Sequence, residues 1–435
     1  MSAGKNLAEN SLLRTPETGR GHIMSEIKIE IDAAEAGLDP DRLRRFDDYL
    51  DGLVEAGRMP GWVGIIARDG KIAHIGTGGH RDREAGLAME ADSLFRSWSL
   101  TKPFTSVAAL ALYEDGAFGL NDPVADYIPS LRDVRVYTRG GGANLESRPA
   151  REPIRIWHLL THTAGFTYGF HHSHPVDELY VQRGFEWSAP PGIDLATAVD
   201  TWASLPLLFE PGTAWNYGVS TDVLGRLIEV VSGKSLDTVV AERITQPLGL
   251  HDTKFWIEPE ETQRLAAIYM ADPATGLAVR NDAMGGDPTQ RPTWLSGSAG
   301  LLTTAADFHT FLQMLLAGGT WNGARVLSPA TVRYMTTNQL PGGADLGSFG
   351  RPVLPALTTM AGLGFGFGFM TVLDPAASKV IANPGEFSWY SATSTYFFVD
   401  PVTRITALAF PQLFPSKALP LFSRLRQLVH AAVIE

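Results

Sequence analysis

The sequence predicts an α+β protein in which strands from both ends of the chain form one antiparallel sheet, flanked by terminal helices. Two observations carry this prediction. Alternating apolar runs with turn signals occur in residues 61–79 and again in residues 393–410, whereas the long stretch between them has mainly helix and loop patterns. A meander confined to one half of the chain would not give this distribution. One sheet built from both ends is therefore the simplest arrangement.

The first expected element is an amphipathic helix. In residues 39–57, apolar side chains recur at helical spacing from Leu43 to Val54. Asp39 or Asp41 can cap the start of this helix with a side-chain oxygen. An apolar stripe of this kind is buried against other elements, so the helix is expected to flank the sheet.

Hairpins are predicted at both ends of the chain. Residues 61–79 contain two apolar runs joined by an Asp-Gly pair, which is a strong hairpin signal. Residues 393–410 repeat the pattern with an Asp-Pro pair at the turn. A final amphipathic helix is expected over residues 417–433.

The pattern also predicts a division of the chain. Residues 1–24 resemble a disordered leader. Residues 25–115 and 290–435 would form a discontinuous sheet domain, and residues 116–289 an inserted, mainly helical domain. The active site is expected in the cleft between these two domains.

Composition excludes several kinds of partner and site. The net charge of −11 argues against nucleic acid or an anionic membrane as partner, and the absence of cysteine excludes disulfides and thiolate metal sites. No stretch reaches the ~18 apolar residues of a membrane span. The N-terminal stretch lacks the apolar segment of a signal peptide, which predicts a cytoplasmic protein. The sequence leaves open whether the protein is a monomer or a homo-oligomer.

The stretch SWSLTKPF places Ser99 and Lys102 one helical turn apart, just before an apolar run. Pro103 falls in the first turn of the expected helix, where its missing N–H costs nothing. Ser99 then lies at the N-terminus of a buried helix, where free backbone N–H groups and the helix dipole stabilise an oxyanion. A desolvated lysine has a lowered pKa and can act as the base that a serine nucleophile needs.

The S-x-x-K spacing alone leaves a second interpretation open. Ser99 could be an ordinary helix cap, with Lys102 reaching solvent. The same spacing recurs by chance after Ser2 and after Ser25, where no buried helix follows. The motif therefore needs support from other parts of the chain.

Two distant stretches supply that support. In EPGTAWNYGVSTDVLGRLIE, a Pro-Gly turn leads into Tyr217 and then into a helix, a junction that can present a phenol to a cleft. In GEFSWYSATSTYFFVDP, Trp389 enters an expected edge strand whose backbone N–H groups can complete an oxyanion hole. Trp98, beside Ser99, can line an acyl pocket, although a core position fits it equally well.

These stretches run in a fixed order with WHLLTHTAGF, QPLGLHDTKF and SGSAGLLTTAADFHTFL, and together they cover nearly the whole chain from residue 40 onward. In the residues and order of these stretches, the chain resembles the serine β-lactamase/penicillin-binding-protein superfamily, in its class C-like branch. Within that branch it most resembles the family VIII carboxylesterases. The resemblance implies a β-lactamase/transpeptidase-like fold. That fold has an antiparallel sheet with terminal helices and a helical domain, in agreement with the elements expected above.

The resemblance also implies roles for individual residues. Ser99 would be the nucleophile, and Lys102 with Tyr217 the coupled base that activates it and later protonates the leaving group. Trp389 matches the position where β-lactamases begin K-T-G and family VIII esterases begin W-G-G. Ala392 would then donate the second oxyanion N–H beside that of Ser99. The candidate substrate-binding residues are Trp98, Trp389 and Tyr390.

The sequence departs from the β-lactamase pattern in two places. After Tyr217 it has Gly218 and Val219, where β-lactamases of this branch have an asparagine that contacts the substrate's acylamino group, and the K-T-G lysine is also missing. Both losses favour carboxylic esters over β-lactams. Tyr390 and Ser391 replace the two glycines of W-G-G, which is expected to narrow the acyl cleft or re-aim the strand.

The predicted function is a serine hydrolase, a carboxylesterase that cleaves small-molecule esters through an acyl-enzyme on Ser99. Three alternatives stay open: an acyltransferase using the same residues, a weak β-lactamase or D-amino-acid peptidase-like protein, and a binding protein whose site has lost its chemistry. No cofactor or metal is expected. The neighbouring His171, His172 and His174 match no zinc-site spacing, and a polar loop near the cleft mouth is favoured for them.

Overall fold

The structure is a computed structural model that describes residues 27–353 and 359–434. The leader expected for residues 1–24 lies outside the described residues. The α-helices are α1 Pro40–Glu55, α2 Thr101–Glu114, α3 Ile156–Leu160, α4 Pro175–Gln182, α5 Leu195–Ala203, α6 Ser220–Ser232, α7 Leu236–Val240, α8 Gln246–Leu248, α9 Ala305–Leu316, α10 Pro329–Thr336, α11 Leu346–Phe349, α12 Pro375–Ser378 and α13 Leu421–Ala432.

The strands are β1 Gly61–Arg68, β2 Lys71–Asp82, β3 Leu87–Ala88, β4 Leu94–Arg96, β5 Arg135–Arg139, β6 Glu146–Pro149, β7 Tyr269–Ala271, β8 Ala278–Arg280, β9 Leu302–Thr304, β10 Thr320–Trp321, β11 Ala324–Arg325, β12 Leu363–Phe365, β13 Met370–Val372, β14 Phe387–Tyr390, β15 Tyr396–Asp400, β16 Ile405–Phe410 and β17 Leu413–Phe414. The large sheet contains β12 to β16 together with β1 to β3, so most of its strands come from the two ends of the chain.

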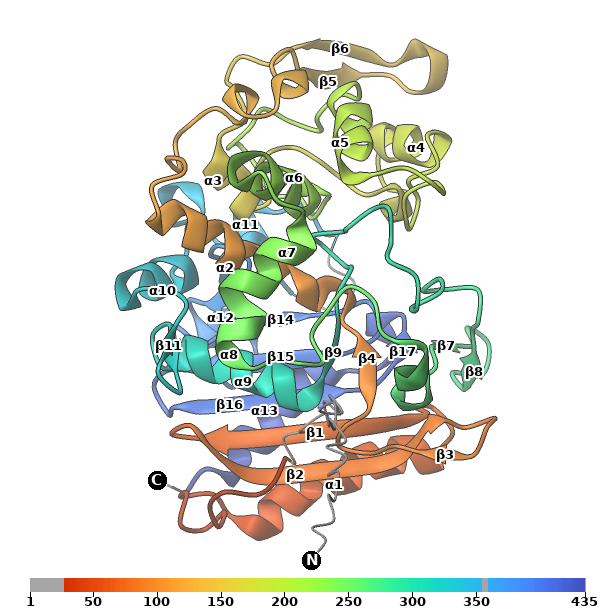
Figure 1. The fold of residues 1–435 in the computed structure, drawn as a ribbon, viewed down its shortest axis with the longest axis vertical. Coiled ribbons are helices and arrows are strands. Elements are labelled where there is room, and N and C mark those ends of the chain that lie inside the picture. Colours follow the sequence, from red (N-terminus) through yellow and green to blue (C-terminus); the bar gives the residue numbers. More distant parts are fainter. Residues whose placement is uncertain (1–26, 354–358, 435) are drawn as a thin grey trace, which may run out of the picture.

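This sheet is antiparallel throughout, in the order β12-β13-β14-β15-β16-β1-β2-β3. The N-terminal hairpin joins the C-terminal one where β1 pairs with β16, with Ile65 opposite Leu408 (Figure 1). Asp69 and Gly70 both have positive φ, which is the turn that an Asp-Gly pair favours between two strands. The prediction of one antiparallel sheet built from both ends of the chain is confirmed.

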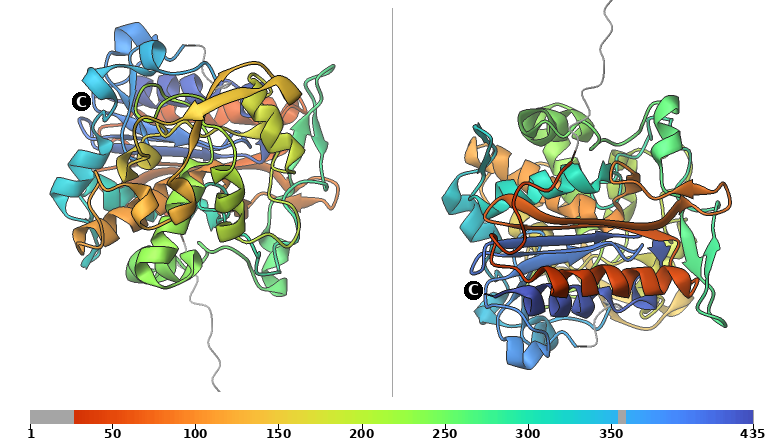
Figure 2. Two further views of the ribbon diagram at one scale, coloured as in Figure 1. Left: turned by 90° about the horizontal axis from the view of Figure 1, so that it is seen from above. Right: turned by 90° about the horizontal axis from the view of Figure 1, so that it is seen from below.

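Helices cover both faces of the sheet. α1 and α13 lie side by side on one face (Figure 2, right), where the Asp39 N–H donates to the carbonyl of Ala432 over 2.7 Å. The expected first helix is confirmed, with Asp39 as its cap. On the other face, α9 packs against β1, β15 and β16. The final helix begins at Leu421, later than predicted, because Pro420 holds the preceding residue in extended backbone.

The middle of the chain forms a region of helices and short hairpins beyond α2. α6 packs against α2, α3, α5 and α7, while the β5–β6 hairpin lies at the far end of the molecule (Figure 1). β7 and β8 form a small sheet with β17 from the C-terminal part. One continuous cluster of buried apolar residues runs through the sheet and the helices. The division at residues 116–289 therefore stays a proposal.

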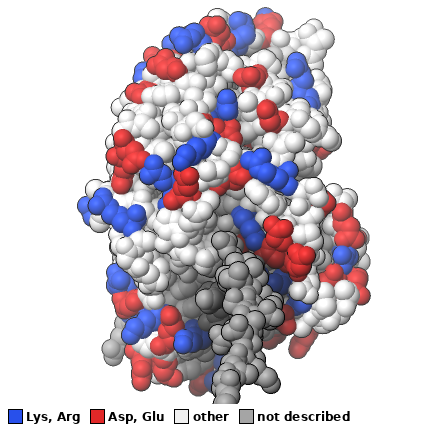
Figure 3. Space-filling view, viewed as in Figure 1, with Lys and Arg blue, Asp and Glu red and all other residues white. Residues whose placement is uncertain are grey.

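The surface and the helix lengths bear on possible partners. Within the described ranges, none of the helices has the length and apolar character required to cross a membrane. On the face seen in Figure 3, acidic and basic side chains intermingle over the described part of the surface. On that face the described acidic side chains therefore do not form one continuous acidic patch.

Candidate active site

Ser99 lies at the junction of a strand and a helix. β4 is held by β9 and ends at Arg96, and a single 3-10 turn over Trp98–Leu100 leads directly into α2. Trp98, just before Ser99, has a φ of 46°, a left-handed backbone that costs a non-glycine residue energy. Strain of this kind is typical of functional turns. As predicted, Ser99 lies at the N-terminal end of a buried helix.

Lys102 lies one turn further along α2 and is almost completely buried, with 2% of its surface exposed. Its Nζ lies 3.4 Å from Ser99 Oγ and donates to the carbonyl oxygen of Ser298 at 3.1 Å. Burial disfavours the charged amine and lowers the pKa of Lys102 to about 7, against the opposing attraction of the Asp222 carboxylate. A lysine with this pKa is uncharged in a large fraction of molecules at neutral pH and can accept a proton.

Tyr217 completes the group of three. Its hydroxyl lies 2.6 Å from Ser99 Oγ, and its ring lies 4.6 Å from Lys102 Nζ. Burial raises the pKa of Tyr217 far above its usual value, so the phenol keeps its proton at neutral pH.

The interpretation of Lys102 as a solvent-exposed side chain is wrong, because α2 is buried on every side at that position.

The backbone of Tyr217 is held in place by two residues that sequence reasoning did not single out for this role. Asn216 Nδ2 donates to the carbonyls of Phe166 and Tyr217, and His171 Nε2 lies 2.8 Å from the carbonyl of Tyr217. A Cβ at Gly218 would lie 2.5 Å from the Phe166 carbonyl oxygen. Glycine is thus required after Tyr217 by the close approach of another backbone segment.

These side chains open into a cavity of about 520 Å³. Ser99, Lys102 and Tyr217 are among the residues that line it, and most of its other lining residues are aromatic or apolar. The lining includes Trp98, Tyr168, Phe170, His171, Trp187, Ser298, Tyr390 and Ala392. Trp98, Tyr390 and Ala392, three of the candidates from the sequence, are among them.

Trp389 does not line this cavity, contrary to its prediction as a substrate-binding residue. It is 1% exposed, and its ring packs 5.5 Å from the ring of Tyr217 and 5.4 Å from that of Phe365. Its strand is also not an edge strand, because β14 lies between β13 and β15. β13 pairs only with the first half of β14, up to Ser388, which explains how the second half can still border the cavity. Trp389 is a buried support for Tyr217.

The two residues that replace the glycines of W-G-G behave differently. Tyr390 is among the residues that line the cavity. Ser391 is fully buried, and its hydroxyl lies 3.1 Å from that of Thr393. Its side chain therefore leaves the cavity free, and only one of the two replacements affects the space available to a substrate.

The three clustered histidines point to different partners. His171 contacts the backbone of Tyr217, His172 lies between Glu178 and Glu186, and His174 accepts the N–H of Val176 at the start of α4. They share no common ligand position. His171 also lines the cavity, and a polar loop near the mouth of the cleft stays a prediction.

One group of potential metal ligands does lie close together in the described part of the chain: Glu386, Asp400 and His430. These groups have other partners. The guanidinium of Arg426 donates to Glu386, His430 contacts the same carboxylate at 3.1 Å, and Asn383 donates to Asp400 at 2.7 Å. The arrangement is a buried ion-pair network between α13 and the sheet.

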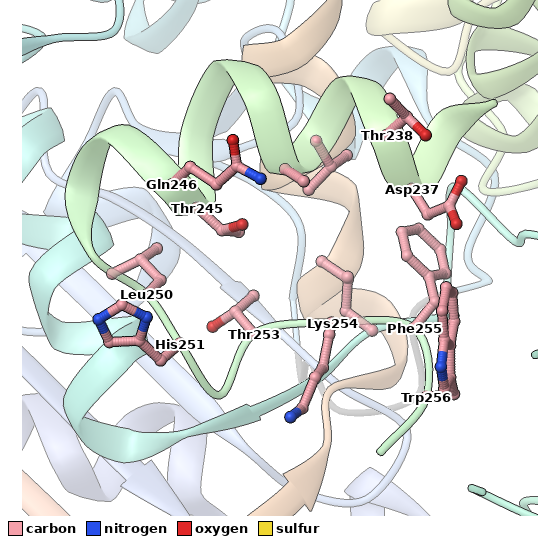
Figure 4. A pocket seen from close by; sticks show the side chains of 13 residues that line it. Asp237, Thr238, Thr245, Gln246, Leu250, His251, Thr253, Lys254, Phe255 and Trp256 are labelled. Atoms are coloured by element: carbon pink, nitrogen blue, oxygen red, sulfur yellow. The ribbon is translucent and has the colours of Figure 1, made fainter. Parts of the chain in front are cut away.

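A second cavity, of about 400 Å³, lies beside α7 and α8 (Figure 4). Its charged residues are already paired, Asp237 with Arg291 and Lys254 with Glu261. His251 lies in its wall without a serine or cysteine nucleophile beside it. The first cavity, not this one, combines a nucleophile with a base.

Comparison with known proteins shows the family to which the chain is similar. The model of the family described as Beta-lactamase matches residues 46–430. Protein Rv1367c of Mycobacterium tuberculosis is 35% identical over 367 residues, covering 83% of this chain and 88% of that protein. Esterase EstB of Burkholderia gladioli is 28% identical over 408 residues, covering 89% and 95%. The solved structure of EstCE1, a hydrolase with promiscuous acyltransferase activity, superposes with a TM-score of 0.75 at 25% identity and covers 90% and 99%.

Proposed function

Because the chain belongs to the Beta-lactamase family, we propose that it is a serine hydrolase that cleaves carboxylic esters through an acyl-enzyme on Ser99. The observation that carries this proposal is the contact of Ser99 Oγ with two proton-transfer groups. The Tyr217 hydroxyl lies at 2.6 Å and the buried Lys102 amine at 3.4 Å. A serine hydroxyl becomes a nucleophile only when such a base takes its proton.

In the first step, Ser99 Oγ attacks the ester carbonyl carbon. Lys102 in its uncharged form is the base, because its lowered pKa of about 7 lets it accept a proton at neutral pH. Tyr217 cannot be the resting base, since its raised pKa keeps the phenol protonated. The phenol instead passes a proton to the departing alkoxide and recovers one from Lys102. The C–O bond to the alcohol breaks, and the acyl group stays on Ser99.

We assign the oxyanion of the tetrahedral intermediate to the backbone N–H groups of Ser99 and Ala392. Two facts support this assignment: Ser99 lies at the start of α2, where N–H groups are free of helical partners, and Ala392 lines the same cavity. In the second step, water attacks the acyl carbon with Lys102 and Tyr217 again moving the proton. The acid is released and Ser99 regains its hydrogen.

The choice of esters over β-lactams rests on the sequence after Tyr217 and on the lining of the cavity. Val219 stands where β-lactamases of this branch have an asparagine, so the amide group that contacts an acylamino substituent is missing. The apolar and aromatic lining suits an uncharged acyl or alcohol group. The similarity to EstB and EstCE1 supports ester chemistry as well.

The test is hydrolysis of p-nitrophenyl esters of graded chain length, with intact mass recorded after reaction with a p-nitrophenyl phosphonate. We expect turnover and a single covalent adduct that maps to Ser99 and is lost in Ser99→Ala. Folded protein with neither turnover nor adduct would contradict the proposal. An adduct without hydrolysis would instead point to acyl transfer, which a competing alcohol in the assay would reveal as a new ester product.

A further inference from the structure

Asp222 is a buried carboxylate that the steps above do not use. It lies in the first turn of α6 and is completely buried. Three donors from one short segment face it: Ser296 Oγ at 2.7 Å, Ser298 Oγ at 2.5 Å and the Ser298 backbone N–H at 3.3 Å. A carboxylate taken out of water needs such donors in its charged form. Burial raises the pKa of the Asp222 carboxyl, whereas these hydrogen bonds and the nearby Lys102 amine oppose that shift and favour the charged form.

The segment that Asp222 holds is the one that holds Lys102. The carbonyl oxygen of Ser298 accepts the hydrogen bond of Lys102 Nζ at 3.1 Å. The neighbouring Gly297 is wedged between the two helices, with its carbonyl accepting from Thr105 Oγ1 at 2.6 Å. The same network thus ties Asp222 on α6 to Lys102 on α2 through Ser298.

We propose that Asp222 is a positioning residue for Lys102: it orients the amine through Ser298, and its negative charge sets the pH range in which Lys102 works as a base. The inference rests on the proposed function. It adds a fourth residue to the site, one that touches neither the substrate nor the reacting atoms.

The other groups around Lys102 support this assignment. Tyr217 and Tyr168 face it with their rings, and burial raises the pKa of both phenols, so they are neutral near pH 7. Burial and the nearby amine lower the pKa of His162 well below its usual value, so this ring is neutral too. Asp222 opposes the effect of burial on the pKa of Lys102. Its charge therefore keeps that pKa from falling further.

The test is the pH dependence of Ser99 phosphonylation in the full chain, measured by intact mass with a p-nitrophenyl phosphonate. In this reaction the Oγ–P bond forms, p-nitrophenolate leaves and the serine proton goes to the base. For the wild type we expect the rate to rise with pH to a plateau, with a midpoint near 7. Asp222→Asn keeps the shape but removes the charge, so its midpoint should move to lower pH by about one unit, and the plateau should fall about tenfold.

Ser298→Ala separates orientation from charge. It removes one hydrogen bond to Asp222 and keeps the carboxylate, so the plateau should fall while the midpoint stays. A wild-type profile for this variant would overturn the positioning role, even if Asp222→Asn did not fold. A folded Asp222→Asn protein with an unchanged or raised midpoint would overturn the role of the charge.

A matched control is Asp307→Asn. Asp307 is also buried, with a pKa raised to about 7 by burial, yet it is not among the residues lining the cavity. This variant should keep the wild-type midpoint, and a shift here would overturn the assignment of the profile to Lys102 and Asp222. If the wild type is not phosphonylated at any pH, the proposed function itself is refuted. If the wild type reacts but the Asp222→Asn variant has the same pH profile, only the role of Asp222 is refuted.

Discussion

At the scale of single residues, the hydroxyl of Ser99 lies between a phenol and an amine that the chain brings from different places. Tyr217 lies 118 positions away in sequence, and Lys102 one helical turn away. The same S-x-x-K spacing after Ser2 and Ser25 shows that the short motif is not sufficient. What distinguishes Ser99 is the buried helix that follows it, because burial lowers the pKa of the lysine.

A row of stacked rings forms the wall of the cavity beyond Tyr217. Tyr168 stacks on Phe170 at 4.7 Å, and Phe170 on Trp187 at 4.5 Å, with interplanar angles of 18° and 9°. Trp187 is the outermost ring and is 49% exposed. A flat apolar group of a substrate can extend this stack.

We expect Trp187→Ala to raise the KM for a p-nitrophenyl naphthoate about tenfold while leaving that for p-nitrophenyl acetate almost unchanged, because only the larger acyl group reaches the outer ring. Both esters have the same leaving group, so any effect of the substitution on the binding of that group cancels in the ratio of the two KM values. The control is Tyr334→Ala, which removes an equally exposed ring that does not line the cavity. Equal changes for both esters would argue against the aromatic wall as an acyl site.

At the scale of elements, α13 is fastened to the sheet by a buried ion-pair network. The guanidinium of Arg426 is 1% exposed, contacts Glu386 and donates to Ser388 Oγ at 3.0 Å. Glu386 immediately precedes β14, the strand that carries Trp389 and Tyr390. A helix remote from the cavity thus helps to hold a strand that borders it.

Removing the arginine should leave the Glu386 charge buried without its main partner. We expect Arg426→Ala to lower the free energy of unfolding by about 3–5 kcal/mol, measured by chemical denaturation. Arg424→Ala is the comparison, because Arg424 lies on the same helix but exposed, hydrogen-bonded to Gln427, and its loss should cost less than about 1 kcal/mol. Similar losses for the two variants would contradict the importance of the buried network.

Sequence reasoning located most elements but misjudged some of their neighbours. It placed the first helix and both hairpins, because their periodicity and turn residues are local signals. It missed that β14 has a partner on each side, since β13 is a short strand that pairs with only half of it. It also missed the contacts of Asp222, whose hydrogen-bond partners Ser296 and Ser298 lie more than seventy positions away in the sequence.

At the scale of the whole molecule, buried titratable groups link stability to pH. Burial lowers the pKa of His309 from 6.5 to about 4. Between these values the unfolded chain binds more protons at this site than the folded protein, so the free energy of unfolding falls as pH falls from 6.5 towards 4. Asp307 contributes with the opposite sign, because burial raises its pKa and the folded protein holds its proton up to about pH 7.

A difference measurement isolates His309. In His309→Asn the amide oxygen can replace Nδ1 as the acceptor facing Gln313, and the ring no longer titrates. We expect the stability of this variant relative to the wild type to increase by up to about 1.4 kcal/mol per pH unit as the pH is lowered from 6.5 to 4. Chemical denaturation at several pH values checks this. A difference that is constant with pH would show that His309 titrates normally in the folded protein.

The sequence by itself determined the fold class, because periodicity and turn residues are local signals. Its resemblance to a known family also singled out Ser99, Lys102 and Tyr217, which the structure brings together. Only the tertiary structure decided that Trp389 and Ser391 are buried, and that Ser298 forms hydrogen bonds with both Asp222 and Lys102. The physical reason is that burial and hydrogen-bond partners depend on which distant segments meet. Local patterns in a single sequence do not specify these contacts between distant segments.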